Sequence, residues 1–399
     1  MPAQTPSSLI SVAEARARLF ALAPSIETET IPIREAASRW AADDILALRT
    51  QPVTDLSAMD GYAIRFADLP GPLTLIGESA AGRSFSGTIG PGETVRIFTG
   101  AAMPTGADTV LVQEEAARDG DRVTLAGEGP KNQGRNIRRK GLDFSTGDLL
   151  VAKGDRLNPP RIAVAATGGH GALAVHRRLR VAIVATGDEL VAPGTALNDA
   201  MLPESNGAML AAMLADLPAD IVNLGILPDQ LDIIADAFGR VDADILVTTG
   251  GASVGDHDLV RPALEAAGGS LDFWRIALRP GKPMMAGRLG TAVVLGLPGN
   301  PVSAYVTAFL FLRPLIAAMS GAVDPLPRTI TAILGEDLPA NDHREDYLRA
   351  ETREGRVFSL GLQDSSMLRT LARADCLIVR RPHALAAAAG DSVEILSLV

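Results

Sequence analysis

Cysteine is almost absent from this chain: Cys376 is the one thiol among 399 residues. A single cysteine cannot form a disulfide within the chain, and it cannot supply a cysteine-rich zinc or iron–sulfur site. Aromatic residues are also scarce, at 4% of the composition. The hydrophobic cores must therefore be built from Ala, Val, Leu and Ile.

Positive charge is in short supply as well. The 37 Lys and Arg residues face 47 Asp and Glu residues, which gives a formal net charge of −10. Nucleic acids and anionic membranes attract proteins that carry a broad positive field. We therefore expect no nucleic-acid partner and no membrane partner, and an anionic ligand would need local basic groups or a bridging metal.

Long uninterrupted hydrophobic runs are missing too. The N-terminal residues Met-Pro-Ala-Gln-Thr-Pro lack the basic start and apolar stretch of a signal peptide. The most apolar long segment, Tyr305 to Met319, contains Arg313 and Pro314 and is expected to be too short to span a bilayer. These features favour a cytoplasmic protein.

The texture of the sequence changes along the chain in a way that predicts several domains. From about Thr50 to Asp148, short apolar runs alternate with Gly and Pro, which is typical of a small β-rich module. From Arg180, apolar runs alternate with helical segments of 10–15 residues, which predicts a parallel, doubly wound α/β sheet. Gly321 to Pro327 resembles a linker, and the residues after it predict a second small β domain.

Several individual elements can be placed. Ser11 and Glu14 form a capping-box pattern, so we expect a helix that ends before Pro24, and a second helix is expected over Arg34 to Ala42. In the α/β part, strands with helices between them are expected at Val181–Ala185, Ile221–Ile226, Ile245–Thr248, Leu271–Ala277 and Ala292–Leu297.

Ligands of open parallel sheets bind beyond the carboxyl ends of the strands. The loops at those ends carry acidic and basic side chains, namely Asp188, Glu189, Asp229, Asp256, Asp258, Arg279 and Lys282. Carboxylates that lie close together at one edge of a sheet repel each other unless a cation binds between them. Oxygen-only ligands favour Mg²⁺, which in such sites usually bridges to a substrate phosphate.

Other motifs allow a functional and a purely structural interpretation. Gly250–Gly255 either cradles an anion with its backbone N–H groups or forms a tight turn; it is not a Walker A loop. Leu297–Pro301 is either a rigid turn or the wall of a pocket, with Pro301 suited to the first position of a helix. Asp60, followed by Gly61, is either a turn residue or functional. The basic run Lys131–Lys140 is either a solvated surface or a region that steers an anion.

Taken together and in this order, these motifs resemble the molybdopterin molybdenumtransferases, a family that includes the C-terminal region of gephyrin. The resemblance covers nearly the whole chain. The segments that carry it are Ser57–Ala63, Thr99–Val110, Gly134–Asp143, Ala185–Leu190, Thr248–Asp258, Arg279–Pro283 and Leu297–Ala304.

The resemblance implies a multidomain α/β plus β fold. An elongated, discontinuous domain would comprise residues 1–48 and 144–178, and a β-rich insertion domain would comprise residues 49–143. A molybdopterin-binding α/β domain would follow at 179–322, and a C-terminal β barrel at 323–399. It also implies a homodimer in which a cleft is shared between the subunits.

The implied activity belongs to molybdenum cofactor biosynthesis. Molybdate would be inserted into adenylylated molybdopterin with the help of Mg²⁺, releasing AMP and giving molybdenum cofactor. A contact with the molybdopterin adenylyltransferase that makes the substrate is also implied.

The resemblance further implies roles for individual residues. Those implied in catalysis are Asp60, Thr99, Glu189, Asp229 and Asp258. The implied metal ligands are Glu189, Asp229 and Asp258. Those implied in binding the pterin, the phosphates or molybdate are Gly250, Gly251, Ser253, Gly255, Pro298, Asn300, Pro301, Arg279, Lys282, Arg349 and Ser366.

Two alternatives stay open at this point. A molybdopterin adenylyltransferase shares the α/β domain, although the additional domains and the Asp60 motif count against it. A non-catalytic scaffold of the gephyrin kind would keep the fold without the chemistry. The complete acidic set argues against scaffolding alone.

Overall fold

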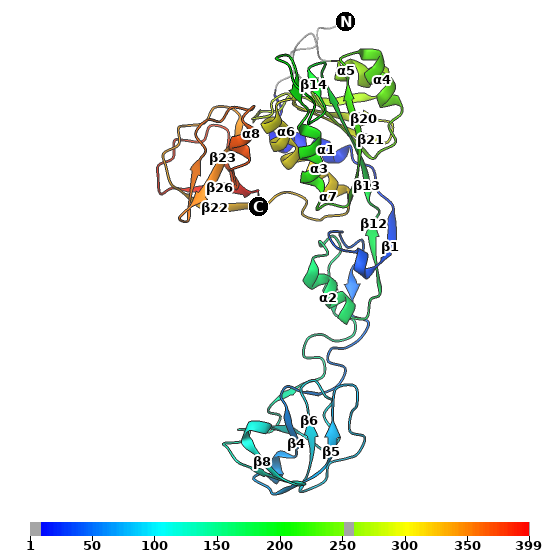
Figure 1. The fold of residues 1–399 in the computed structure, drawn as a ribbon, viewed down its shortest axis with the longest axis vertical. Coiled ribbons are helices and arrows are strands. Elements are labelled where there is room, and N and C mark those ends of the chain that lie inside the picture. The colour runs from blue at the N-terminus through cyan, green and yellow to red at the C-terminus, as the bar shows by residue number, and fades with distance from the viewer. Residues whose placement is uncertain (1–8, 251–258, 399) are drawn as a thin grey trace.

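The computed structural model describes residues 9–250 and 259–398 of the chain. Figure 1 shows an α/β body with a β barrel at its side, a narrow stalk below it, and a separate β-rich body at the far end of the stalk. The multidomain architecture predicted from the sequence is therefore present. The four cut points proposed for the domains remain predictions.

The α/β body is built on a six-stranded sheet with the order β16-β13-β17-β21-β20-β18. Its first four strands are parallel, whereas the last two run antiparallel to their neighbours. The bounds are β13 Leu179–Thr186, β16 Ala219–Leu227, β17 Ile245–Thr249, β18 Ser270–Trp274, β20 Met285–Leu289 and β21 Ala292–Leu297.

The predicted parallel sheet is thus present over four strands, with an antiparallel pair added at one edge. Strand β20, which the sequence did not predict, joins β21 through a tight turn in which Gly290 has φ 59°. Because a hairpin reverses the chain without a helical crossover, the two strands must be antiparallel. The other five strands confirm the predicted positions to within a few residues.

Helices cover both faces of this sheet. Val181 and Ile183 of β13 pack with α1, α3, α6 and α7 on one face, whereas Ala182 and Val184 pack with α4 and α5 on the other. Burial on both faces explains why the parallel strands are continuous apolar runs. The helix bounds are α1 Val12–Ala21, α3 Asn206–Leu214, α4 Leu231–Gly239, α5 Val260–Ala266, α6 Pro301–Thr307 and α7 Arg313–Met319.

Helix α1 confirms the predicted N-cap. The Ser11 hydroxyl oxygen accepts a hydrogen bond from the Glu14 amide at 3.1 Å, so one of the free N–H groups of the first turn is satisfied. The Glu14 carboxylate lies 3.6 Å from Arg18 on the next turn, so this side chain forms an i,i+4 ion pair.

Helices α6 and α7 are joined by a π-helical turn, Ala308–Leu312, into one helical stretch. Pro314 follows that turn, and a proline offers no N–H to the carbonyl group four residues earlier. The stretch Pro301–Met319 has 19 residues and a hydropathy of 1.7, so by length and composition it could cross a bilayer, contrary to expectation. However, 78% of its apolar window is buried inside the structure, as in the core helix of a soluble protein.

The stalk consists of two chain segments that run side by side (Figure 1). Strand β1, Thr28–Pro32, pairs with β12, Ala172–His176, and short strands β2, Ile45–Leu46, and β11, Leu149–Val151, pair below them. Helix α2, Pro159–Thr167, packs against the pair, with Asn158 as its N-cap.

The helix expected over Arg34–Ala42 is not formed; only a 3-10 turn, Ile33–Glu35, is present there. Ser38 has φ 65°, a left-handed conformation that interrupts a right-handed helix. Trp40 and Ala41 instead make isolated bridges to Arg156 and Val175 of the returning segment. Pairing with a distant segment therefore overrides the local helical pattern.

The β-rich body carries a six-stranded sheet of order β7-β4-β6-β5-β9-β8. A two-stranded ribbon of β3 and β10 lies beside it. The bounds are β3 Leu56–Ser57, β4 Gly61–Ile64, β5 Leu73–Ser79, β6 Glu93–Ile97, β7 Thr109–Val112, β8 Ala116–Asp119, β9 Arg122–Leu125 and β10 Ile137–Arg138.

The C-terminal body is a closed barrel, because β23 pairs with both β24 and β25 in the ring β23-β24-β22-β26-β25. Closure removes the free sheet edges. Strand β19, which lies in the α/β part of the sequence, adds to β23 and ties the two bodies together. The bounds are β19 Leu278–Arg279, β22 Thr329–Leu334, β23 Glu345–Arg353, β24 Arg356–Ser359, β25 Cys376–Arg380, β26 Ser392–Ser397 and α8 Leu368–Leu371.

Candidate active site

The loops that follow β13 and β16 meet at the carboxyl edge of the sheet, as predicted. The Asp188 carboxylate accepts a hydrogen bond from the Asp229 amide at 3.0 Å, which links the two loops directly. Glu189 and Asp229 both have exposed side chains. The chain beyond Glu189 continues as a small ribbon of β14, Leu190–Val191, and β15, Leu202–Pro203. Two of the predicted acidic residues are thus presented to solvent on adjoining loops.

Strand β17 ends in the glycine-rich loop, and the structure describes its first residue. Gly250 has φ +91°, and a Cβ atom there would lie 2.4 Å from the Thr186 carbonyl oxygen. A Cβ on Gly299, from the loop after β21, would touch the Gly250 Cα at 3.4 Å. Three strand-end loops therefore approach one another at backbone distance, which only glycine allows at Gly250.

Part of the predicted site lies outside the described residues. This holds for Gly251, Ser253, Gly255 and Asp258, so their predicted roles remain predictions. Within the described ranges, no group of three His, Cys, Asp or Glu side chains is placed to hold a metal ion. The donor set that is described, Glu189 and Asp229, supplies exposed carboxylate oxygens, which is the ligand chemistry that Mg²⁺ prefers.

The Leu297–Pro301 motif is anchored from both sides. Pro301 is the first residue of α6, as predicted, and Asn300 precedes it. The Asn300 amide donates to the Ser365 hydroxyl at 3.0 Å, and the Val302 N–H donates to the Ser365 carbonyl at 3.1 Å. On the other side, the Asn206 amide donates to the Gly299 carbonyl at 2.8 Å. These hydrogen bonds hold the loop, which includes Pro298, in a fixed position between the α/β body and the barrel.

Arg349 on β23 is almost fully buried, at 1% exposure. Its guanidinium donates to the carbonyl groups of Leu362 and Asp364, at 3.2 and 2.8 Å, and to the Gln363 side chain at 3.2 Å. Burial lowers the pKa of Arg349. In the structure, the Arg349 side chain therefore holds the loop of residues 362–367 in its conformation.

Ser366 belongs to the same loop and is exposed. Its hydroxyl and its amide both donate to the Asp364 carboxylate, at 2.6 and 2.8 Å. These two hydrogen bonds lower the pKa of Asp364. Because the single O–H donor of Ser366 is used by the Asp364 carboxylate, an oxyanion bound by this hydroxyl would have to displace that carboxylate.

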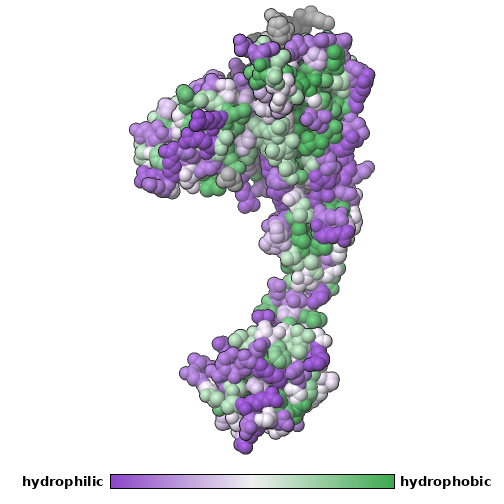
Figure 2. Space-filling view, viewed as in Figure 1, coloured by the Kyte–Doolittle hydropathy of each residue, from purple (hydrophilic) through white to green (hydrophobic). Residues whose placement is uncertain are grey.

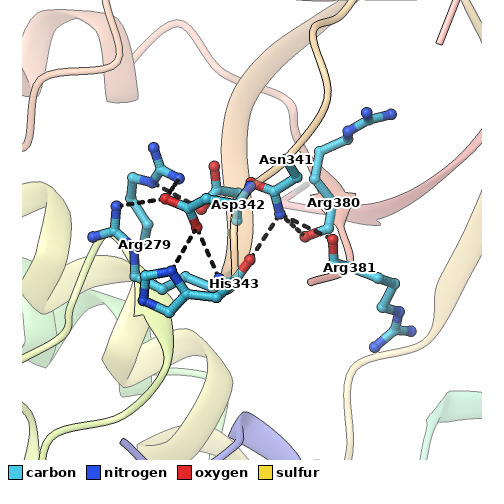
Figure 3. A network of polar contacts seen from close by, with 8 residues as sticks. Arg279, Asn341, Asp342, His343, Arg380 and Arg381 are labelled. Carbon is cyan, nitrogen blue, oxygen red and sulfur yellow. Dashed lines mark hydrogen bonds and ion pairs between the residues drawn. The ribbon is translucent and has the colours of Figure 1, made fainter. Parts of the chain in front are cut away.

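Arg279 faces carboxylates of the barrel (Figure 3). Its guanidinium lies 2.8 Å from the Asp342 carboxylate and donates to Asp346 at 2.9 Å. Arg344 and then the charge of Arg279 hold the pKa of Asp342 far below its usual value, whereas burial raises the pKa of Asp346. Lys282, three residues further along, is exposed and pairs with no carboxylate in the described part of the chain.

Asp60 and Thr99 meet in the β-rich body. One oxygen of the Asp60 carboxylate accepts hydrogen bonds from the Thr99 N–H at 2.7 Å and from the Thr99 hydroxyl at 2.8 Å. These two hydrogen bonds lower the pKa of Asp60. The segment ahead of Asp60 is held by the basic run, since the Ala58 N–H donates to the Asn136 carbonyl at 2.8 Å.

A single chain does not bring the two acidic groups together. Asp60 precedes β4 at the far end of the stalk, whereas Glu189 follows β13 in the α/β body (Figure 1). Two clefts lie apart from both groups. One of about 410 Å³ lies where Trp40 and Arg156 of the stalk face α7, and one of about 630 Å³ lies at the amino edge of the sheet, beside Arg177 and Asp244.

Sequence reasoning missed one side chain at the Asp60 end. Arg96 on β6 donates to the carbonyl group of Gly61, the residue after Asp60, at 3.1 Å. Its position two residues before Phe98 and three before Thr99 was the available signal. That signal is weak, because the strand pairing that places Arg96 opposite Tyr62 cannot be seen in the sequence.

Comparison with known proteins covers almost the whole chain. Residues 10–169 match the family model described as MoeA N-terminal region (domain I and II). Residues 182–318 match a probable molybdopterin binding domain, and residues 331–398 match the MoeA C-terminal region (domain IV).

Individual relatives agree with these matches. The molybdopterin molybdenumtransferase of Haemophilus influenzae is 36% identical, over 97% of this chain and 98% of that protein. Molybdopterin molybdenumtransferase 2 of Mycobacterium tuberculosis is 34% identical, over 92% of this chain and 95% of that protein. A crystal structure of the molybdopterin biosynthesis moeA protein from Pyrococcus horikoshii superposes with a TM-score of 0.83 at 27% identity, covering 98% of this chain and 100% of the other.

Proposed function

The chain belongs to the molybdopterin molybdenumtransferase family and is a transferase of molybdenum cofactor biosynthesis, and we propose that its substrates are adenylylated molybdopterin and molybdate. In this proposal, molybdate is inserted at the dithiolene of the pterin, the pyrophosphate bond is cleaved, AMP is released, and molybdenum cofactor is the product. The reaction depends on Mg²⁺.

The observation that supports the proposal is the local arrangement of the candidate carboxylates. Asp60 accepts hydrogen bonds from both donors of Thr99, and these hydrogen bonds lower its pKa. Glu189 and Asp229 stand exposed on loops joined by the Asp188 hydrogen bond. Carboxylates exposed at the carboxyl edge of a parallel sheet suit a bound cation and a polyphosphate.

The chain's own residues would divide the chemistry as follows. Glu189 and Asp229, together with Asp258, hold Mg²⁺, which when bound neutralises charge on the pyrophosphate. Asp60 accepts a hydrogen bond from a water molecule aimed at phosphorus. The water oxygen bonds to phosphorus, the bridging P–O bond breaks, and the bridging oxygen stays with the other phosphate. The proton lost by the water passes by way of Asp60 to solvent, and AMP is set free. Thr99 keeps the Asp60 carboxylate in place through this step.

The pterin and the oxyanion would be bound at the loop between the α/β body and the barrel. Gly250, Gly251, Ser253 and Gly255 would bind the phosphates and the pterin, together with Pro298, Asn300 and Pro301. Lys282 and Ser366, which are exposed, would bind molybdate. Arg279 and Arg349 contribute there through the Asp342 ion pair and the 362–367 loop.

The assembly and setting belong to the same proposal. The protein works as a homodimer in the cytoplasm, and a cleft is shared so that Asp60 and Thr99 of one subunit meet Glu189 and Asp229 of the other. Adenylylated molybdopterin is received from a molybdopterin adenylyltransferase, and neither nucleic acid nor a membrane takes part. The distance between the two acidic groups within one chain supports this arrangement.

A product assay tests the proposal. Purified protein is incubated with adenylylated molybdopterin, molybdate and Mg²⁺, and AMP and molybdenum cofactor are quantified. AMP release together with cofactor formation is expected, and an excess of chelator should abolish both. Release of pyrophosphate from ATP and molybdopterin would identify an adenylyltransferase instead, and formation of neither product would leave a scaffold.

A further inference from the structure

Three strand ends of the β-rich sheet meet at the edge where Asp60 lies. Asp60 comes directly before β4, Phe98 comes directly after β6, and Gln113 comes directly after β7. Strand β4 pairs with both β6 and β7, so the three positions are neighbours in space although they are distant in sequence. Whatever holds these ends together also fixes the direction of the Asp60 carboxylate.

Arg96 contacts all three strand ends. Its guanidinium donates to the Gly61 carbonyl group at 3.1 Å and also to the side-chain oxygen of Gln113. It lies between two rings, 5.1 Å from the centre of Tyr62 and 4.9 Å from the centre of Phe98. A planar cation between two π faces gains from stacking and from its fork of donors at the same time.

The contacts of Arg96 reach both members of the Asp60–Thr99 pair. Gly61 and Tyr62 follow Asp60 directly, and Phe98 precedes Thr99 directly. Gln113 also contacts Asp60 directly, because the Gln113 N–H donates to the Asp60 carbonyl group at 3.1 Å. One side chain thus restrains the backbone on each side of the hydrogen bonds that orient the carboxylate.

We propose that Arg96 is a positioning residue for Asp60: it clamps the three strand ends so that the carboxylate is held ready for the reaction, and it does not touch the substrate itself. Two of the guanidinium nitrogens of Arg96 already donate to partners in its own body, the Gly61 carbonyl group and the Gln113 side chain. The positive charge of Arg96 also lowers the pKa of Asp60, after the two hydrogen bonds from Thr99. The inference rests on the proposed function, because it assigns Asp60 to the reaction.

The kinetic test uses the full-length protein and the variants Arg96→Gln and Arg96→Lys, with Arg122→Gln as the control. Arg122 is an exposed arginine on β9 of the same sheet. Because small misplacements of a reacting group are costly, kcat should fall by about 10–100-fold in both Arg96 variants while KM changes by less than about two-fold. Arg122→Gln should behave as wild type.

Two kinetic outcomes would overturn the proposal. Full activity of Arg96→Lys would show that a charge is sufficient and that the clamp is not needed. A rise in KM at unchanged kcat would show that Arg96 binds substrate directly. Phe98→Leu provides a milder variant in case the arginine variants fail to fold, since it removes one ring of the clamp and keeps an apolar side chain. An intermediate loss of kcat is expected from it, and unchanged kcat would count against the clamp.

A second measurement separates the clamp from the proposed function. The titration midpoint of the Asp60 carboxyl group is followed by NMR in the protein without substrate. It should move to higher pH in Arg96→Lys, which keeps the charge, because a loosened loop weakens the hydrogen bonds from Thr99; in Arg96→Gln the loss of the charge adds to the shift. An unchanged midpoint would refute the clamp even in an active enzyme. If the midpoint shifts in the variants but the wild-type protein forms no cofactor, the proposed function alone is refuted.

Discussion

Asp60 illustrates how a single exposed carboxylate acquires a defined chemical state. Among the residues that the structure describes it forms no salt bridge, and it accepts hydrogen bonds from the N–H and the hydroxyl of Thr99. Hydrogen bonds to the ionised form favour that form, so the pKa of Asp60 lies below its ordinary value. A carboxylate that remains ionised in this way is an acceptor throughout the physiological range.

Thr99→Val tests this account. The variant keeps the backbone N–H and loses the hydroxyl donor, so the pKa of Asp60 should rise toward its ordinary value. If activity requires the ionised carboxylate, the acid limb of the pH–rate profile should shift to higher pH in the variant. The NMR midpoint of Asp60 and the profile should move together; a midpoint that stays in place would show that the backbone donor is sufficient.

Gly250 is a second residue whose surroundings fix its identity. Gly250→Ala would place a Cβ atom 2.4 Å from the Thr186 carbonyl oxygen, on a backbone with φ +91°. We expect a loss of about 1–3 kcal/mol in the free energy of unfolding, because strain and a steric clash add up. Gly239→Ala is the control, since nothing lies within 4 Å of a Cβ there. Equal stability of the two variants, measured by urea unfolding, would contradict the clash.

At the scale of elements, the junction between the stalk and the α/β sheet is held by paired charges. Strand β12 of the stalk runs into β13 of the sheet with two arginines between them, Arg177 and Arg178. Asp244, ahead of β17, accepts two hydrogen bonds from Arg177, at 2.7 and 2.8 Å, and one from the Arg180 N–H at 2.8 Å. Burial alone would raise the pKa of Asp244, but these partners outweigh it and lower the pKa.

Asp244→Asn should therefore destabilise the junction. A loss of about 1–3 kcal/mol is expected, because Asp244 is largely buried and its partners are charged. Since the folded-state pKa is lowered, the stabilisation by Asp244 is present above its unfolded pKa and disappears as the pH falls through the folded pKa. The variant should therefore lose less stability than wild type on acidification.

Asp242→Asn is the matched control for this junction. Asp242 pairs with Arg180, but its side chain is 86% exposed. An exposed pair contributes at most about 1 kcal/mol, so this variant should remain close to wild type. Urea unfolding followed by tryptophan fluorescence reports the transition, since Trp40 lies in the stalk and Trp274 lies on β18. Identical loss in both variants would contradict the burial argument.

At the scale of the whole molecule, the two acidic groups lie on bodies that the stalk keeps apart (Figure 1). Figure 2 shows hydrophobic residues on the surface of the stalk and of the α/β body. Leu48 and Leu149, near the lower end of the stalk, are 61% and 56% exposed. A second copy that supplies the missing half of the site is consistent with both observations.

Complementation between inactive variants tests the shared site. Asp60→Asn and Glu189→Gln should each fold normally and form little cofactor. A purified heterodimer of the two should recover about half of the wild-type activity per dimer, because one of its two sites then contains both intact carboxylates. A heterodimer of Asp60→Asn with the Asp60→Asn/Glu189→Gln double variant should stay inactive. An inactive mixed heterodimer in the first case would show that the site is not shared.

Local patterns predicted a large part of this fold. Three features were visible in the sequence because each depends on neighbouring residues: the Ser11 cap, the apolar run of β13 that is buried on both faces, and the helix that begins at Pro301. The strand-end rule also placed Glu189 and Asp229 on loops that meet. The same local reasoning was wrong for the helix expected over Arg34–Ala42, where a distant segment competes for the backbone.

The amino-acid sequence by itself determined the class of elements, the order of the bodies along the chain and the family resemblance, since periodicity and short motifs are properties of adjacent residues. Only the tertiary structure decided which charges meet: Arg279 with Asp346, 67 residues away; Arg349 with the loop it shapes; and Arg96 with the strand ends beside Asp60. Such pairs form when strand pairing and domain packing bring distant segments into register, and no period in the sequence records that register.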